Sequence, residues 1–278
     1  MKSENVLNVV SVSGGKDSTA LYCLGIEFYG QSFLPVFADT GNEHPVTVNY
    51  VRNLHLMAGG PVVRIVQADF TEKLRGKVVT GNSFLDMMRW KGRAPSTKAQ
   101  FCTEWVKLWP ILQFLEINHP YQEWIMHVGL RAGESEARAK RYPFEWNKYF
   151  DCDSINPLLY ETAESIFSYL AEKNVPPNPL YALGYKRVGC FPCIHANKLE
   201  LSLLPDWAWE KLAYWERELG RSWFPPGVLP GKPPGYVASI LEVRQWCKTS
   251  RGGKQYDLFK SVHPADAPSC LSTWGICE

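Results

Sequence analysis

Residues 13 to 18, Ser-Gly-Gly-Lys-Asp-Ser, are the string in this chain that is best suited to hold a phosphate. They follow an apolar run, 5–12, which predicts a buried strand, and they precede helical spacing over 17–29. A glycine pair lets the backbone approach a phosphate, and a helix N-terminus directs N–H groups and partial positive charge at it. Lys16 adds a cation and Ser18 a hydroxyl donor. The string is not a Walker A loop, because an Asp separates its Lys from its Ser. A tight turn with a surface lysine is the alternative.

The second group with chemistry is the CxxC pair of Cys190 and Cys193. Two thiolates at this spacing can chelate one metal ion or cluster. The sequence contains a single CxxC, which disfavours a zinc ribbon, and the residues before it do not fit a thioredoxin-like redox pair. Eight cysteines without a signal-peptide layout indicate metal binding or redox chemistry rather than a disulfide framework. We interpret Cys23, Cys152 and Cys247 as small buried hydrophobes.

The elements that must position these groups alternate between strand and helix. Apolar runs predict strands at 5–12, 33–38, 62–66 and 124–130. Helical spacing predicts helices at 17–29, 44–57, 104–117, 162–173 and 205–219. This alternation predicts the α/β class, with a Rossmann-like (HUP-type) parallel sheet that has helices on both faces.

Composition and the end of the alternation suggest how the chain is organised. The 278 residues are 45% hydrophobic and 21% charged, which excludes disorder, and the net charge of +2 excludes a strongly basic binder. No apolar run is long enough to span a membrane, so we expect a cytoplasmic protein. Residues 225–235 hold five Pro and three Gly and predict a loop. We expect a nucleotide-binding domain over 1–195 and a helical, loop-rich, Cys-containing region over 196–278 that contributes to a metal-cluster site.

Several segments resemble the motifs of one protein family. Residues 13–18 resemble the PP-loop of the ATP pyrophosphatase (adenine nucleotide alpha hydrolase) superfamily. Four further segments resemble motifs of the phosphoadenosine phosphosulfate (PAPS) reductase family, namely 37–43, 101–110, 129–138 and 178–193. Together they span about two thirds of the chain in family order. The chain is therefore identified as a PAPS reductase-like member of the PP-loop superfamily.

This resemblance implies that ATP or PAPS binds along the carboxyl edge of the sheet, beside a switch point in strand order. The residues implied to hold the nucleotide are Ser13, Gly14, Gly15, Lys16, Asp17, Ser18, Asp39, Thr40, Gly41, Gly129, Arg131, Glu134 and Arg138. The implied catalytic residues are Lys16, Asp17, Asp39 and Arg131. The two aspartates would meet Mg²⁺ on the phosphates, and the arginines would hold phosphate by forked hydrogen bonds. The alternatives are a turn-forming role for Asp39 and a solvated helix start for Arg138.

The resemblance also implies an iron–sulfur cluster. Family members that hold one combine the CxxC with a cysteine from an earlier helix start, and Cys102 fills that position. The expected ligands of a 4Fe–4S cluster are therefore Cys102, Cys190, Cys193 and Cys270, with Cys277 as the alternative fourth ligand. Adenosine phosphosulfate (APS) reductases carry two adjacent cysteines at the earlier site, whereas this chain has Phe101 before its cysteine. His195 is expected on a helix surface, with ligation as the alternative.

Departures from the reductases favour another activity. The chain ends in Gly-Ile-Cys-Glu and lacks the Glu-Cys-Gly tail whose cysteine attacks the sulfate sulfur in true reductases. The complete PP-loop resembles that of the DndC and SspD proteins of DNA phosphorothioation and of some thionucleoside enzymes. Their branch implies that ATP activates a substrate oxygen with release of pyrophosphate, and that a cluster or persulfide at the cysteines supplies sulfur. PAPS or APS reduction, and a non-catalytic nucleotide or redox sensor, remain open alternatives.

A basic stretch between residues 89 and 107 favours a polyanionic partner. It carries five Lys and Arg against Glu104 alone, and Trp90 and Phe101 are placed to stack on bases. A solvated loop is the alternative. The expected partners are a nucleotide, a nucleic-acid acceptor, and a sulfur donor such as a cysteine desulfurase or other partner subunits. A homodimer is a further expectation, and no membrane partner is expected.

Overall fold

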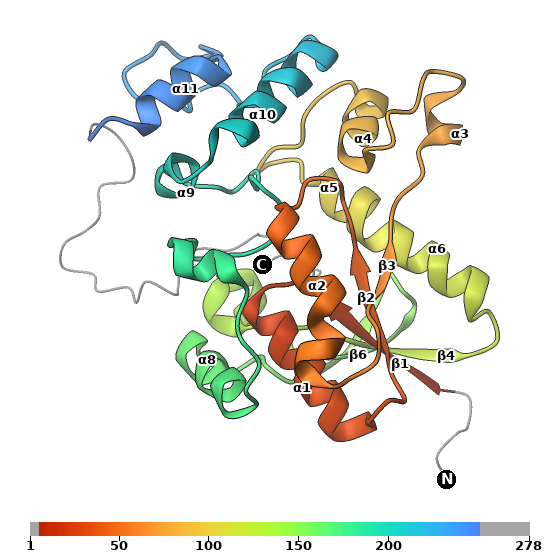
Figure 1. Ribbon diagram of the computed structural model, residues 1–278. Coiled ribbons are helices and arrows are strands. Elements are labelled where there is room, and N and C mark those ends of the chain that lie inside the picture. Colours follow the sequence, from red (N-terminus) through yellow and green to blue (C-terminus); the bar gives the residue numbers. More distant parts are fainter. Residues whose placement is uncertain (1–5, 251–278) are drawn as a thin grey trace.

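The computed structural model describes residues 6–250, so the expected ligands Cys270 and Cys277 lie outside the described residues. A six-stranded sheet forms the centre of the molecule (Figure 1). Its strands are β1 (Val6–Val12), β2 (Leu34–Ala38), β3 (Arg64–Val66), β4 (Glu123–His127), β5 (Phe144–Asn147) and β6 (Cys152–Ile155). The strand order is β3-β2-β1-β4-β6-β5. Among the described residues, no helix is both long and apolar enough to cross a membrane.

Strand β1 lies in the middle of the sheet and marks the switch in strand order. It pairs in parallel with β2 on one side, where Val9 is opposite Leu34. It pairs in parallel with β4 on the other side, where Val10 is opposite His127. The chain thus builds outward from β1 to β3 and then returns to place β4 on the opposite flank. The carboxyl ends of β1 and β4 therefore flank the point where open α/β sheets bind ligands.

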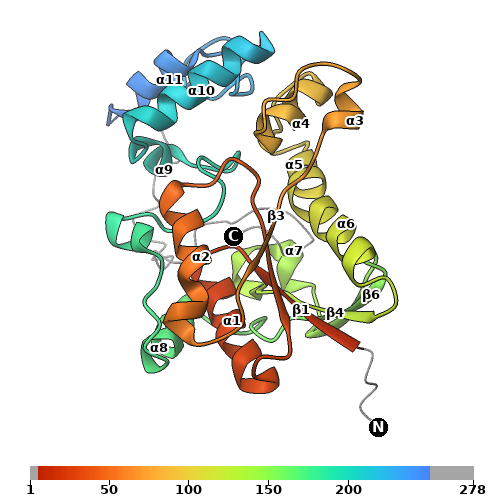
Figure 2. The ribbon, with the colours of Figure 1, turned by 45° about the vertical axis from the view of Figure 1, so that its right-hand side comes forward.

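Both faces of the sheet are covered by helices, as predicted (Figure 2). Successive side chains of a strand point to opposite faces, so Val9 and Val10 belong to different cores. One face packs against α1 (Lys16–Tyr29), α2 (Pro45–Ala58) and α8 (Ala163–Glu172). The other face packs against η1 (Glu104–Leu108) and α6 (Trp109–Asn118). The Rossmann-like α/β prediction is confirmed.

The sheet is not entirely parallel, however. Strand β5 pairs antiparallel with β6 at the edge, and the sequence prediction contains neither strand. Both are four residues long and half of their residues are polar, so neither contains an apolar run from which a strand could be predicted. Five short helices were also missed, and they are α3 (Thr71–Leu74), α4 (Ser83–Lys91), α7 (Glu136–Ala139), α9 (Lys198–Ser202) and α11 (Ile240–Cys247). The 3₁₀ turns η2 (Ala132–Glu134) and η3 (Pro179–Leu183) complete the loops near β4 and α8.

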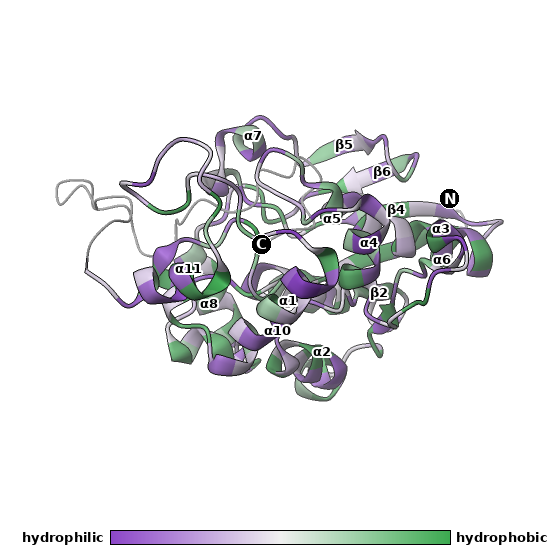
Figure 3. Cartoon of the chain, turned by 90° about the horizontal axis from the view of Figure 1, so that it is seen from above, coloured by the Kyte–Doolittle hydropathy of each residue, from purple (hydrophilic) through white to green (hydrophobic). Residues whose placement is uncertain are grey.

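The helices after residue 195 form a layer above the carboxyl edge of the sheet, seen from above in Figure 3. Helix α10 (Asp206–Leu219) packs against α4 and against α11 (Ile240–Cys247). The rings of Phe84 and Trp215 stack with centroids 5.5 Å apart. One hydrophobic cluster joins α4, the CxxC segment and these helices, so the core continues across residue 195. The division into two domains stays a prediction.

Candidate nucleotide and cysteine site

The loop of residues 13–18 lies between the end of β1 and the start of α1, where the sequence placed it. Gly14 has a φ of +82°, a conformation that favours glycine. A Cβ there would also lie 2.8 Å from Thr47 Cγ2 and 2.9 Å from Val51 Cγ2 of α2. Gly15 caps α1 without a side-chain hydrogen bond. The glycine pair therefore fits the loop tightly against α2 and keeps side chains away from the helix N-terminus.

The two serines of the loop hold its shape. The Ser13 N–H donates to Ser18 Oγ at 3.1 Å, and Ser18 Oγ donates to the Gly15 carbonyl at 3.1 Å. These bonds connect the end of the strand to the first turn of the helix. The loop is therefore already formed before a ligand arrives, and the entropy of ordering it is not a cost of binding.

A segment far along the chain clamps this loop from outside. The Lys16 N–H donates to the Tyr181 hydroxyl at 2.9 Å, and Asn178 Nδ2 donates to the Gly14 carbonyl at 3.1 Å. An anion at the helix N-terminus would compete with the Tyr181 hydroxyl for that N–H. Sequence reasoning noted residues 178–181 only as a family motif and missed this contact. Apart from that motif, the sequence of this segment offers only the Asn178-Pro179 pair, which indicates a turn and no contact with the loop.

A chain of buried charges connects the loop to the segment after β4. Asp17 is fully buried and has a cation on each oxygen, with Lys16 Nζ at 2.9 Å and Arg131 Nε at 2.8 Å. Arg131 also approaches Glu134 at 3.5 Å, and Glu134 pairs with Arg138. Mg²⁺ at Asp17 would have to displace one of these cations, so that role stays a prediction. The alternative of a solvated helix start for Arg138 is wrong, because its side chain is fully buried.

Gly129 lets the end of β4 approach the loop. A Cβ at this position would lie 3.2 Å from the Asp17 carbonyl carbon and 3.3 Å from the Ser18 nitrogen. These atoms belong to the backbone at the start of α1, so they cannot move away by a change of side-chain rotamer. The predicted nucleotide-binding residues of β1 and β4 are therefore brought together at the switch point.

The residues after β2 that were predicted to bind the nucleotide mainly form hydrogen bonds with their neighbours in sequence. Asp39 Oδ1 accepts from the Gly41 N–H at 2.9 Å, which is the turn-forming role given above as the alternative. Thr40 donates to Glu43 through both its N–H and its hydroxyl, at 3.0 and 2.7 Å. Burial raises the pKa of Glu43 to about 7, assisted by the charge of Asp39 and opposed by Thr40 and Lys107. Glu43 lies in the family motif 37–43, but the sequence analysis assigned it no role.

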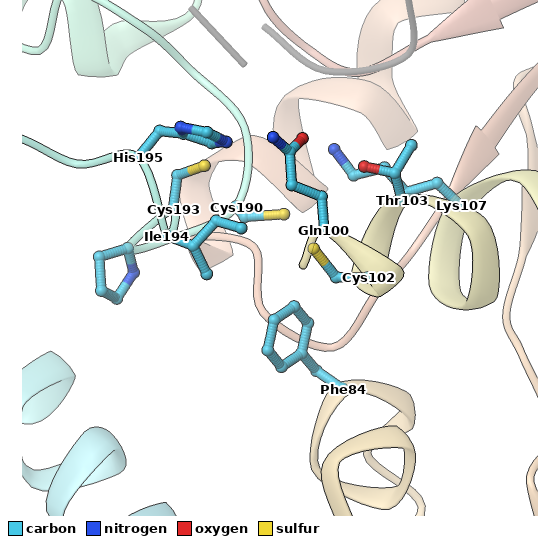
Figure 4. A pocket seen from close by; sticks show the side chains of 10 residues that line it. Phe84, Gln100, Cys102, Thr103, Lys107, Cys190, Cys193, Ile194 and His195 are labelled. Atoms are coloured by element: carbon cyan, nitrogen blue, oxygen red, sulfur yellow. The ribbon is translucent and has the colours of Figure 1, made fainter. Parts of the chain in front are cut away.

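The three expected cluster ligands within the described residues line one pocket. Cys102, Cys190 and Cys193 surround it together with His195 and Lys107 (Figure 4). The β2 segment reaches the same place, because Glu43 forms an antiparallel bridge with Cys190. The prediction that His195 lies on a helix surface is wrong, since it lies in the turn before α9 and lines the pocket.

An unusual helical turn places the first of these cysteines. The predicted helix from 104 begins instead with α5 (Phe101–Thr103) and the π-helical η1, whose i→i+5 bonding follows from Pro110. Proline has no N–H to donate to the carbonyl of Val106, and its ring crowds that carbonyl, so the preceding turn widens. Cys102 of α5 and Lys107 of η1 both line the pocket.

Lys211 of α10 ties the helical layer to the cysteine loop. Its ammonium donates to Asn42 Oδ1 at 2.8 Å and to the Phe191 carbonyl at 2.6 Å. It also lies over the rings of Trp207 and Trp215, at 5.6 and 5.0 Å from their centroids. Burial lowers the pKa of Lys211 to about 8, and the nearby Glu43 opposes that shift. Sequence reasoning missed Lys211 because no motif surrounds it.

The thiols of Cys102, Cys190 and Cys193 suit a thiophilic metal ion or cluster, but they do not stand at metal-binding distances from one another. Within residues 6–250, no group of three or more His, Cys, Asp or Glu side chains stands at metal-binding separations. The cavity measures about 20 Å³, roughly the room of one water molecule, so the lining side chains would have to move apart. Three convergent thiols are nevertheless the ligands that such a group requires.

The remaining described cysteines are packed in hydrophobic surroundings, as predicted. Cys23, Cys152 and Cys247 are buried, and burial raises the pKa of each thiol to about 11. They therefore stay protonated and unreactive near neutral pH.

The chain belongs to the phosphoadenosine phosphosulfate reductase domain family, whose profile matches residues 7–196. An uncharacterized 37.8 kDa protein of Escherichia phage 186 is 36% identical over an alignment of 339 residues, 99% of this chain and 98% of the phage protein. The APS reductase of Agrobacterium fabrum is 40% identical over 88 residues, 31% of this chain and 33% of the reductase.

A solved PAPS reductase from Candida auris, in a phosphate complex, is 20% identical and covers 69% of this chain and 84% of its own, with a TM-score of 0.47. A likeness this distant carries no argument about activity.

Proposed function

We propose that the protein is a PP-loop ATP pyrophosphatase that adenylates an acceptor so that sulfur can replace an oxygen atom. The observation that carries this proposal is the intact loop of residues 13–18, preformed at the switch point and joined to Arg131 through buried ion pairs. A helix N-terminus with a lysine and an arginine behind it suits a triphosphate, which carries more negative charge than the 5′-phosphosulfate group of PAPS.

In the proposed reaction, the positive charges of the site stabilise cleavage of ATP between its α and β phosphates. An acceptor oxygen attacks the α-phosphorus of ATP, the bond from this phosphorus to the bridging oxygen breaks, and pyrophosphate leaves with the electron pair. Negative charge would grow on the leaving pyrophosphate, and in this proposal Lys16 and Arg131, which both pair with Asp17, neutralise it. Because Asp17 holds both cations in place, little reorganisation is needed during the reaction.

The cysteine pocket would supply the sulfur. Cys102, Cys190 and Cys193 would hold a cluster, which would supply a thiophilic metal centre, or one of them would carry a persulfide. In the persulfide route, the terminal sulfur attacks the acceptor atom that bears the adenylated oxygen, and AMP leaves with the electron pair of the broken bond. A second pocket thiol then cleaves the resulting acceptor–S–S–Cys bond, which releases the thiolated acceptor and leaves a cysteine disulfide that an external dithiol reduces. A cysteine desulfurase or another partner subunit is the proposed source of that sulfur, and the proposed acceptor is a nucleic acid, as in DNA phosphorothioation of the DndC and SspD type.

A side-by-side nucleotide assay tests this function. Anaerobically purified protein is incubated with ATP and Mg²⁺, and separately with PAPS and with APS, while pyrophosphate and sulfite are measured. The proposal requires pyrophosphate from ATP, at a slow rate until the acceptor completes the site. The matched control is Lys16→Ala, which should lose this activity and bind ATP more weakly while the chain remains folded.

Reduction of APS or PAPS is the second candidate, and it rests on the local similarity to the Agrobacterium reductase. Under this alternative, a thiolate attacks the sulfate sulfur and the nucleotide leaves, so sulfite appears after a second thiol reduces the intermediate. Sulfite from APS or PAPS in the presence of thioredoxin, with no pyrophosphate from ATP, would establish the reductase and exclude the adenylating enzyme.

A further inference from the structure

Four aromatic rings gather beside the cysteine pocket and form what we call the aromatic platform. Its members are Trp90 of α4, Phe101 of α5, Trp105 of η1 and Trp109 of α6. The ring centroids of Trp90 and Trp105 lie 4.7 Å apart, and those of Trp105 and Trp109 lie 5.5 Å apart. All four side chains remain partly exposed. Contiguous apolar surface that is exposed and has polar groups around it commonly marks an interaction site.

Cations lie directly over these rings. Lys73 Nζ is 4.6 Å from the centroid of Trp105 and 4.8 Å from that of Trp109. Lys91 Nζ is 3.8 Å from the Trp90 centroid, and the Arg93 guanidinium is 5.4 Å from that of Phe101. Each cation is held at the platform by its ring, so charge and aromatic surface occur at the same place.

The charge of this region differs from that of the rest of the chain. Residues 71–107 contain eight Lys and Arg against three Asp and Glu, a net charge of +5, whereas the whole chain carries +2. Asp86 is buried and bonded to Thr80, and Lys107 is buried beside the cysteine pocket, so the other charged residues of this segment are seven bases and two acids. Such a segment attracts a polyanion although the protein as a whole is nearly neutral.

The platform adjoins the pocket through two helices, α5 and α4. Phe101 belongs to the platform, and the next residues, Cys102 and Thr103, line the pocket together with Gln100. Helix α4 makes the same connection, because Phe84 at its start lines the pocket and Trp90 lies at its end. Figures 1 and 2 both show α3, α4, α5 and α6 as neighbours on this side of the molecule. A nucleic-acid strand that lies on the platform would therefore lie beside residues that line the cysteine pocket.

We infer that the aromatic platform binds single-stranded nucleic acid. Lys73, Lys91 and Arg93 then turn from the ring faces to the phosphates, and bases stack on the ring faces that they leave. The inference rests on the proposed function, because it locates the acceptor of that reaction. Aromatic stacking requires unpaired bases, so a duplex fits this surface poorly. The basic side chains supply the phosphate contacts that dominate the affinity of such complexes.

Fluorescence anisotropy with labelled oligonucleotides of about 16 residues tests the inference on the full chain. The arms are single-stranded DNA, single-stranded RNA, an abasic strand of the same length, and duplex DNA. We expect either natural single strand to bind at least about tenfold tighter than the abasic strand and the duplex, since stacking contributes roughly this factor per base. The better of the two natural strands then identifies the acceptor class.

Two variants assign the binding to the platform. Trp105→Ala should weaken binding about tenfold through lost stacking. Lys91→Glu, at an exposed position, should weaken binding and reduce the salt dependence by roughly one phosphate contact. The matched controls are Tyr121→Ala and Lys148→Glu, which change an exposed ring and an exposed lysine on other elements and should leave affinity unchanged.

The outcomes separate this inference from the proposed function. Equal binding of the abasic strand, or equal loss of affinity in the control variants, would overturn the platform assignment. So would wild-type affinity in Lys91→Glu, which keeps the test valid even where Trp105→Ala fails to fold. Platform-dependent binding without pyrophosphate release from ATP would instead support the platform and contradict the adenylating function.

Discussion

Replacing Gly129 with alanine tests whether the end of β4 must touch the loop of residues 13–18. The added Cβ would lie 3.2 Å from the Asp17 carbonyl carbon and 3.3 Å from both the Asp17 carbonyl oxygen and the Ser18 nitrogen. Ordinary contacts between such atoms are about 3.5–4.0 Å, so strand or loop must shift by several tenths of an ångström. Overpacking of this kind costs about 1–3 kcal/mol of folding stability.

The same shift should disturb the nucleotide site, since Asp17 orients both Lys16 and Arg131. We expect at least a tenfold loss of ATP affinity, equivalent to about 1.4 kcal/mol. Titration calorimetry with ATP measures this loss, and urea unfolding measures the stability.

Gly133→Ala is the matched control, because a Cβ at Gly133 meets no atom within 4 Å. Equal ATP affinity in Gly129→Ala and Gly133→Ala would refute the reasoning that close approach of β4 positions the site.

Three further predictions follow from the described contacts. Gly14→Ala should destabilise the protein more than Gly92→Ala, because both have positive φ but only the first meets other side chains; equal unfolding midpoints in urea would contradict this. Burial lowers the pKa of His127 to about 4 from its usual 6.5, so stability should fall by about 3 kcal/mol as pH drops from 6.5 to 4. His127→Gln should remove this decrease from urea unfolding at each pH, and an identical pH profile would refute the assignment. Lys211→Met should accelerate amide hydrogen exchange around Phe191, whose carbonyl the ammonium holds, and unchanged exchange would show that the contact is dispensable.

The sequence predicted the elements that carry long periodic patterns. The strands β1 to β4 and the helices α1, α2, α8 and α10 all occur close to their expected bounds. They were predictable because burial of a strand or of one helix face leaves a regular apolar pattern. The β5–β6 hairpin was missed because its strands are short and polar, and the turn at η1 was missed because its geometry depends on how one proline is accommodated.

The candidate site was predictable where backbone geometry decides it. The loop of residues 13–18 and the convergence of Cys102 with the CxxC pair followed from motifs. The contacts of Tyr181 and Lys211 could not be predicted, because they join segments about 165 and 20 residues apart. The motif that contains Tyr181 does not indicate its partner, and no motif contains Lys211. The full burial of Arg138 was equally hidden, since a charged residue is buried only when a partner such as Glu134 is folded beside it.

The identity of the bond that breaks in ATP is the most direct test of the central claim. Anaerobic protein is incubated with Mg²⁺ and ATP radiolabelled in its α-phosphate, with and without the single-stranded oligonucleotide that binds best, and the labelled products are separated. Cleavage between the α and β phosphates predicts label in AMP or in an adenylated acceptor, with pyrophosphate released in equal amount and no such products from Lys16→Ala. Label found in ADP, or ATP left intact while APS or PAPS yields sulfite, would contradict the account.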